Sequence, residues 1–217
     1  MHKHCLFLFA TLLPAFAFGW ETYAEFETAA TNALYEVEPL YLPAFTNAAR
    51  AFAMSTTNAD ERRTALFIGS IAEYHQTPDP EEPTFALGLW SQSLQGILHP
   101  NPGDVLHWQD VEGSAFLLEW WIGRGQANAA FAAATNLSGI VAGKTSTSPS
   151  APLQQALLHY FNNIDLPLEQ TFRYEAALSA SALGDFPAAT NWSVGLPSRA
   201  LDVIFADEAA LFPDGRQ

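Results

Sequence analysis

Residues 150–161 read SAPLQQALLHYF, and this stretch decides the fold most clearly. Its apolar side chains recur at i, i+3, i+4, i+7 and i+8, which is the spacing of one face of an α-helix. Ser150 suits the N-cap position, and Pro152 suits the first turn, where a missing N–H is not needed. An amphipathic helix is therefore predicted here, and its apolar face consists of Leu153, Ala156, Leu157, Tyr160 and Phe161.

A second apolar seam lies upstream, over residues 105–122, with Asp104 as the expected N-cap. Phe116 and Trp120 project roughly opposite this seam at 100° per residue. A helix that is apolar on two sides is usually sandwiched between neighbouring helices. The seam advances in steps of three and four residues through Val105, Trp108, Val111, Ala115, Leu118 and Ile122.

Helical patterns cover most of the remaining chain, while strand signals are weak. Short turns rich in Pro, Gly, Ser and Asp separate the segments, and turns of this length join antiparallel helices. We therefore predict an all-α fold of stacked antiparallel helical hairpins, an irregular α-α superhelix. It forms one domain over residues 20–217, with 143–149 as a candidate hinge. The further helices are predicted at about 21–35, 40–54, 59–75, 84–98, 126–142, 168–183, 186–196 and 199–211.

Residues 183–189 read LGDFPAA and follow an alanine-rich helical pattern. They resemble the turn of a tetratricopeptide repeat, in which a first helix ends in Leu-Gly and an aromatic residue follows two positions later. A small residue of the family then lets the second helix pack closely. The resemblance implies a tight turn at Gly184, a plug between helices at Phe186 and a close-packing position at Ala189.

Two features depart from this tetratricopeptide-like (TPR-like) pattern. Ser193 stands where the family usually has a large aromatic residue, and no repeat-ending proline follows at the expected place. A weaker echo of the turn at Gly125 lies 59 residues before Gly184, which is not a multiple of the 34-residue repeat. The resemblance covers residues 170–197 and implies a TPR-like hairpin without a regular array.

The N-terminus has the pattern of a secretory signal peptide. Residues 1–4 are mildly basic, residues 5–18 are almost entirely apolar, and the small residues Ala17 and Gly19 precede Trp20 at positions that a signal peptidase recognises. The apolar run is about 14 residues long, short of the roughly 20 that span a bilayer. We expect cleavage of residues 1–19 and export to the periplasm or the extracellular space, without membrane insertion of the mature chain.

Composition excludes several functions. Cys5 is the only cysteine, so cleavage leaves no disulfide, thiolate nucleophile or cysteine-ligated metal. Loss of Lys3 changes the net charge from −14 to −15. Phosphate binding needs clustered basic residues, and here Arg62 and Arg63 are the only adjacent pair. We therefore expect no nucleic-acid partner, and no cofactor motif is present.

Five residues are candidates for a site. Asp104, His107 and Asp110 lie at i, i+3 and i+6 and could hold a metal through mixed nitrogen and oxygen ligands. A solvated helix start, with acidic residues favoured by the helix dipole, is the simpler interpretation. Trp120 and Trp121 cannot point the same way, so one of them could line a ligand groove. Ordinary core packing is the alternative.

Carboxylates are abundant, and Glu112 and Glu119 lie seven residues apart on one predicted helix. This spacing in the sequence does not give the distance between the two carboxyl groups in space, and that distance decides whether they form an acid–base pair. No catalytic motif such as Gly-x-Ser-x-Gly is present.

We therefore predict an exported, non-catalytic helical-repeat scaffold that binds a protein or peptide. The alternatives are a secreted enzyme acting on polysaccharide through paired carboxylates, and a small-molecule or sugar-binding module that uses the tryptophans.

Overall fold

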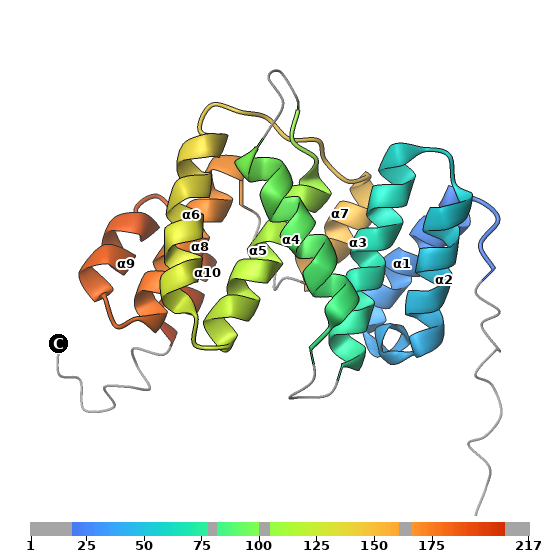
Figure 1. Ribbon diagram of the computed structural model, residues 1–217, viewed down its shortest axis with the longest axis horizontal. Helices are drawn as coiled ribbons and strands as arrows, with labels where there is room; N and C mark the ends of the chain where they lie inside the picture. The colour runs from blue at the N-terminus through green and yellow to red at the C-terminus, as the bar shows by residue number, and fades with distance from the viewer. Residues whose placement is uncertain (1–18, 78–81, 100–104, 161–165, 207–217) are drawn as a thin grey trace, which may run out of the picture.

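The computed structural model describes residues 19–77, 82–99, 105–160 and 166–206. Within these ranges the fold is all-helical, with ten α-helices, one 3-10 helix and no β-strand (Figure 1). The predicted all-α fold is therefore confirmed. No helix in the described ranges is long and apolar enough to cross a bilayer. The predicted signal peptide, apart from Gly19, lies outside the described residues, as does Asp104.

The helices occur in the predicted order, and most of their bounds lie within a few residues of the prediction. The elements are α1 (Tyr23–Glu36), η1 (Glu38–Tyr41), α2 (Pro43–Ser55), α3 (Ala59–Gln76), α4 (Thr84–Leu98), α5 (Trp108–Gly123), α6 (Ala127–Val141), α7 (Ala151–Tyr160), α8 (Leu168–Ala182), α9 (Phe186–Ser193) and α10 (Ser198–Ile204). α9 ends earlier than predicted because the chain turns at Gly195, whose φ is +84°.

The start of α5 also differs from the prediction, because α5 begins at Trp108 and not at about residue 105. Leu106 is held in a parallel β-bridge to the chain after α6. Its N–H donates to the carbonyl of Thr145 at 3.2 Å, and its carbonyl accepts the N–H of Thr147 at 2.8 Å. The hydroxyl of Thr147 also accepts the N–H of Trp108 at 3.1 Å. These bonds tie the 143–149 segment to the start of α5, and its role as a hinge stays a prediction.

The helices stack along the chain, with α1–α3 at one end of the molecule and α8–α10 at the other (Figure 1). Most sequence neighbours pack as hairpins, including α2 with α3, α4 with α5, and α8 with α9. α7 departs from this order. After α6 the chain crosses back so that α7 packs against α1, and it then returns so that α8 packs against α6. This excursion places α7 opposite one face of α5 and α8.

The buried side chains form three clusters that follow the stack. The first joins α1–α3 with α7, the second lies among α4–α6 and the start of α8, and the third lies among α8–α10. Phe116 packs against both the first and the second cluster, so α5 is sandwiched as its two apolar sides predicted. Gly113 allows close packing of α5 on α4, since a Cβ there would lie 3.0 Å from the Ser93 hydroxyl.

The turn between α8 and α9 has the geometry that the tetratricopeptide resemblance implied. Gly184 has φ +73°, Ala189 is fully buried and Phe186 is half-buried. The junction of α5 and α6 has the same form, with Gly125 also at φ +73°. In both turns the residue after the glycine donates its N–H to the carbonyl five residues earlier, at 2.9 Å and 2.8 Å. This is the Schellman bond that ends a helix at a left-handed residue.

Candidate functional site

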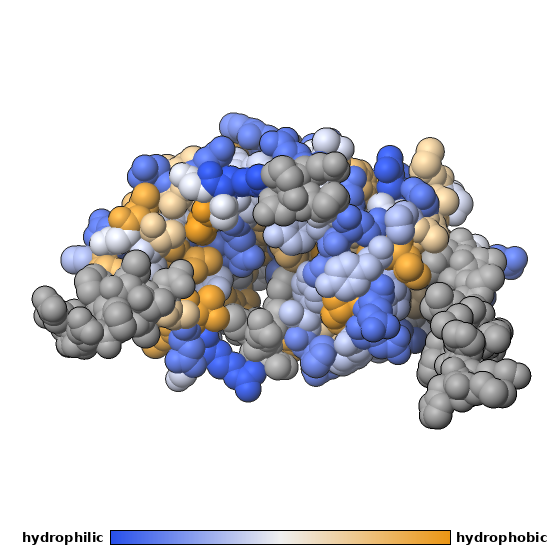
Figure 2. Space-filling model, turned by 90° about the horizontal axis from the view of Figure 1, so that it is seen from below, coloured by the Kyte–Doolittle hydropathy of each residue, from blue (hydrophilic) through white to orange (hydrophobic). Residues whose placement is uncertain are grey.

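A cavity of about 760 Å³ lies where α7 faces α5 and α8. Side chains of α1, α3, α5, α7, α8 and α10 line it, among them three glutamates, three tyrosines and two histidines. No lysine or arginine is among the described residues of its wall. We call it the acidic cavity. The molecule is hollowed on its underside between the N-terminal and C-terminal helices, and apolar side chains gather beside the hollow (Figure 2).

α5 contributes two of the three carboxylates through its helical repeat. Trp108, Glu112, Ala115 and Glu119 follow one another at steps of four, three and four residues, and all four border the cavity. Residues with this spacing share one face of a helix. The opposite face of α5 is buried in the second core cluster, so this acidic face is the one left to the cavity.

α8 contributes the third carboxylate, Glu175, beside Thr171 and Tyr174. Glu175 is only 1% exposed, and its Oε2 atom accepts no hydrogen bond from the described residues. Burial raises the pKa of Glu175 well above its ordinary value, and the charges of Glu119 and Glu112 raise it further. Burial and the neighbouring charges therefore both favour the protonated form of this carboxyl.

Burial also raises the pKa of Glu119, to about 7. The side chain has substantial accessible surface, yet protein closely surrounds it and limits its hydration. Both observations agree with a carboxylate that borders an enclosed body of solvent. The cavity thus holds two carboxyl groups, Glu119 and Glu175, whose pKa values are raised above the ordinary range of glutamate.

Aromatic side chains form another part of the cavity wall, and two of them are hydrogen-bonded to each other. His75 Nε2 pairs with the hydroxyl of Tyr160. Burial lowers the pKa of His75, so its neutral form is favoured. Burial raises the pKa of Tyr160, and the charges of Tyr74 and Glu119 add to that effect. The pKa of Tyr174 is raised in the same way, by burial and then by the charges of its glutamate neighbours.

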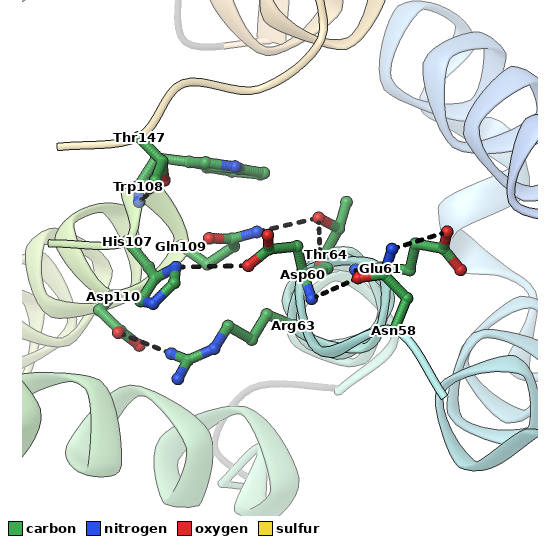
Figure 3. A network of polar contacts seen from close by, with 10 residues as sticks. All are labelled: Asn58, Asp60, Glu61, Arg63, Thr64, His107, Trp108, Gln109, Asp110 and Thr147. Atoms are coloured by element: carbon green, nitrogen blue, oxygen red, sulfur yellow. Dashed lines mark hydrogen bonds and ion pairs between the residues drawn. The ribbon is translucent and has the colours of Figure 1, made fainter. Parts of the chain in front are cut away.

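The predicted metal ligands His107 and Asp110 point toward α3 (Figure 3), and neither of them lines the acidic cavity. His107 Nδ1 lies 3.5 Å from a carboxylate oxygen of Asp60, and the Arg63 guanidinium donates to Asp110 at 3.0 Å. Asp104, the third member of the proposed metal set, lies outside the described residues. No group of three potential metal ligands occurs in the described part of the chain.

Buried amide and hydroxyl groups complete this set of contacts between α3 and α5. The side-chain amide of Gln109 donates to the Thr64 hydroxyl at 2.9 Å, and that hydroxyl donates to the Asp60 carbonyl at 2.9 Å (Figure 3). We call the ten residues drawn in Figure 3 the paired network. A second cavity, of about 820 Å³, adjoins it, and Arg63 and Asp110 on its wall are already bonded to each other.

Trp120 and Trp121, the predicted ligand-contacting residues, border neither of these cavities. Both are half-buried. The Arg124 guanidinium lies 5.4 Å from the ring centroid of Trp120, while Trp121 packs against the second core cluster. The tryptophan that lines the acidic cavity is Trp108, a member of the predicted apolar seam. Its side chain is only 7% exposed.

Reasoning from the sequence identified Glu112 and Glu119 as members of one helix but missed Glu175. One signal could have found it, because Thr171, Tyr174 and Glu175 lie at i, i+3 and i+4 on a helix that also carries a separate apolar seam. A glutamate on a second buried face of such a helix is unusual, since glutamate is almost never fully buried unless paired.

No protein-family model, curated protein sequence or solved structure matches this chain. The tetratricopeptide resemblance therefore rests on the turn at residues 183–189 and on the packing of α8 with α9. Function has to be argued from the cavities and their side chains.

Proposed function

We propose that this chain is an exported, non-catalytic binding protein whose ligand, a peptide or a segment of another protein, enters the acidic cavity. The observation that carries the proposal is the cavity itself. Its volume of about 760 Å³ lies within the range of roughly 300–1,000 Å³ that is usual for ligand sites. Apolar and aromatic side chains form much of its wall, and a few polar groups converge on it. Stacked helical hairpins commonly offer concave surfaces of this kind to peptides.

Site-specific photocrosslinking in the source cells tests the proposal. A photoreactive amino acid replaces His159, which is exposed and borders the cavity, or Met54, which is 87% exposed on α2 and does not border it. We expect a defined peptide or protein adduct at position 159 and none at position 54. A bulky Ala115→Phe substitution in the cavity wall should abolish the adduct while a thermal melt verifies folding. Equal adducts at both positions, or none at position 159, would contradict the proposal.

A second candidate function is hydrolysis of polysaccharide. The pKa of about 7 at Glu119 favours it, because general acid–base catalysis is most efficient when the pKa lies near the working pH. The test is release of reducing ends from a panel of polysaccharides. Activity that Glu119→Gln removes and that Glu38→Gln, an exposed control outside the cavity, retains would support an enzyme. No release by the unsubstituted protein would reject it.

A further inference from the structure

We propose that the group bound in the acidic cavity is a primary ammonium, which forms salt bridges with Glu175 and Glu119. A lysine side chain, the amino terminus of a peptide and a free diamine share this chemistry. The inference rests on the proposed binding function and adds the chemical class of the ligand.

Glu175 provides the first step of the argument. A buried polar atom without a hydrogen bond costs free energy, and most buried polar atoms in proteins are satisfied. Glu175 Oε2 is buried and lacks a hydrogen-bond partner among the described residues. Glu175 lines a cavity large enough for a ligand. A carboxylate only accepts hydrogen bonds, whereas an ammonium has three N–H donors and no acceptor, so the two groups are complementary.

The charge of the wall provides the second step. Glu112, Glu119 and Glu175 all border the cavity, and its described wall contains no lysine or arginine. The charges of the first two disfavour ionisation of the third, which shows that the three carboxyls are close enough to interact. A cation between them removes this repulsion, an anion increases it, and a neutral sugar leaves it unchanged.

Aromatic rings on the same wall suit a cation on an alkyl chain. Trp108 and Phe116 border the cavity, and an ammonium near an aromatic face is stabilised by the ring quadrupole. Both rings are held by neighbours, Trp108 by an edge contact with Phe67 at 5.1 Å and Phe116 by stacking on Trp90 at 5.0 Å. Ala115 and Leu157 add the apolar surface along which methylene groups pack.

Two other cations fit less well. A metal ion is not favoured, because no group of three potential ligands is assembled within the described ranges. A guanidinium is planar and prefers two parallel bonds to one carboxylate, whereas these carboxylates approach from two helices, α5 and α8. A compact ammonium, with donors in three directions, suits that arrangement better.

Binding exchanges a proton for the ligand. A lysine or alkylamine ammonium, with an ordinary pKa of about 10.4, keeps its protons, while a neutral cavity carboxyl releases one to solvent and becomes the carboxylate of the salt bridge. Higher pH therefore strengthens binding of a lysine or a diamine. A peptide amino terminus has an ordinary pKa of about 7.7–8.0, so its own loss of a proton opposes this trend near pH 8. Protonation of His75 at low pH repels the ligand and acts in the same direction. The raised pKa values of Tyr160 and Tyr174 keep these two side chains neutral. The titratable groups that line the cavity together with Glu175 are Glu112, Glu119, His75, His159, Tyr74, Tyr160 and Tyr174.

Isothermal titration calorimetry on the full mature chain tests the inference. The probes are 1,5-diaminopentane, an acetylated and amidated Ala-Lys-Ala peptide, and a free Ala-Ala-Ala-amide, which distinguish a diamine, a lysine and a peptide amino terminus. Norleucine in place of lysine gives a neutral control of the same shape, and arginine gives the guanidinium control. Each titration is run in phosphate and in HEPES, neither of which is a primary amine, because the enthalpy difference between buffers gives the number of protons released.

We expect at least one amine probe to bind, with a Kd tighter than about 1 mM, and with the neutral control at least tenfold weaker. The Kd should fall by up to about tenfold per pH unit between pH 6 and 8, with up to one proton released. Glu175→Gln and Glu119→Gln should each weaken binding about tenfold, and Glu38→Gln should not. Thermal melts of all three variants verify folding.

Tight binding of the norleucine peptide would overturn the ammonium inference and leave peptide binding standing. Preference for the arginine peptide, absence of proton release, or unchanged affinity in both cavity variants would also overturn it. If no amine probe binds, the inference fails, while a crosslinked partner at position 159 would still support the proposed function.

Discussion

The acidic cavity and the paired network share the first turn of α5 but differ in the partners of their carboxylates. In the network, the Asp110 carboxylate has the Arg63 guanidinium at 3.0 Å. In the cavity, Glu175 is more deeply buried, yet its Oε2 has no partner among the described residues. A compensated set of charges holds two helices together, whereas an uncompensated buried acid is costly to the empty protein. The network also contains buried atoms without a hydrogen-bond partner, His107 Nδ1 and Gln109 Oε1, so the contrast concerns the carboxylates alone. It agrees with a structural role for the network and with the ligand proposed for the cavity.

Trp108 joins the two regions, so its removal should give the largest effect. Its backbone N–H donates to Thr147 in the network, and its side chain packs in the first core cluster and borders the cavity. We expect Trp108→Ala to lower the free energy of unfolding by about 3–5 kcal/mol, as for other buried large aromatic residues. Urea unfolding measures this. Trp108→Phe should cost clearly less, and a loss below about 1 kcal/mol for the alanine variant would show that the ring does not support the core.

Thr64 tests whether the network stabilises the fold. Thr64→Val keeps the shape but removes the hydroxyl that accepts from Gln109, leaving a buried amide without its partner. The expected loss is about 1–3 kcal/mol in chemical denaturation. Thr64→Ser keeps the hydroxyl and should retain most of the stability. Equal stability of the valine and serine variants would mean that the hydrogen bond contributes little.

Glu175 tests the opposite expectation for the cavity. The folded-state pKa values of Glu175 and Glu119 are raised above that of an unfolded glutamate, about 4.3. The folded protein therefore binds more protons than the unfolded protein above that pH, and stability falls as pH rises through the raised values, near 7 for Glu119.

Glu175→Gln cannot ionise, so we expect its melting temperature at pH 8 to exceed that of the unsubstituted protein. An increase of about 2–4 °C corresponds to roughly 1 kcal/mol in a chain of this length. The difference should shrink toward pH 5. Thermal melts across this pH range measure it, with Glu38→Gln as the matched exposed control. A less stable Glu175→Gln at pH 8 would show that the carboxylate already has a compensating partner.

Arg63 should give the smallest effect, because its side chain is 43% exposed. We expect Arg63→Met to cost at most about 1 kcal/mol, since exposed ion pairs contribute little. The cost should disappear in about 1 M salt, where charges are screened over roughly 3 Å. Thermal melts at low and high salt measure this cost. A loss of stability that does not depend on salt would show that packing of the Arg63 methylene chain, and not its charge, is responsible.

Local signals were enough to predict the helices but not the start of α5. Asn58 caps α3 through a contact within a single turn, because its side chain accepts the N–H of Asp60 at 3.0 Å. The boundary at Trp108 depends instead on Thr147, a residue 39 positions away that reaches it only through the return of the chain after α6. No pattern confined to one helix contains that contact.

The candidate site divides in the same way. The sequence by itself determined that Glu112 and Glu119 share a face of one helix, because a 3.6-residue repeat places residues seven apart on the same side. Only the tertiary structure decided that α7 crosses back to α1 and that Glu175 of α8 lines the same cavity as those two glutamates. It also decided that His107 and Asp110 face α3. The physical reason is that burial and charge coupling depend on which helices meet, and contacts between helices distant in the chain leave no periodic trace in either one.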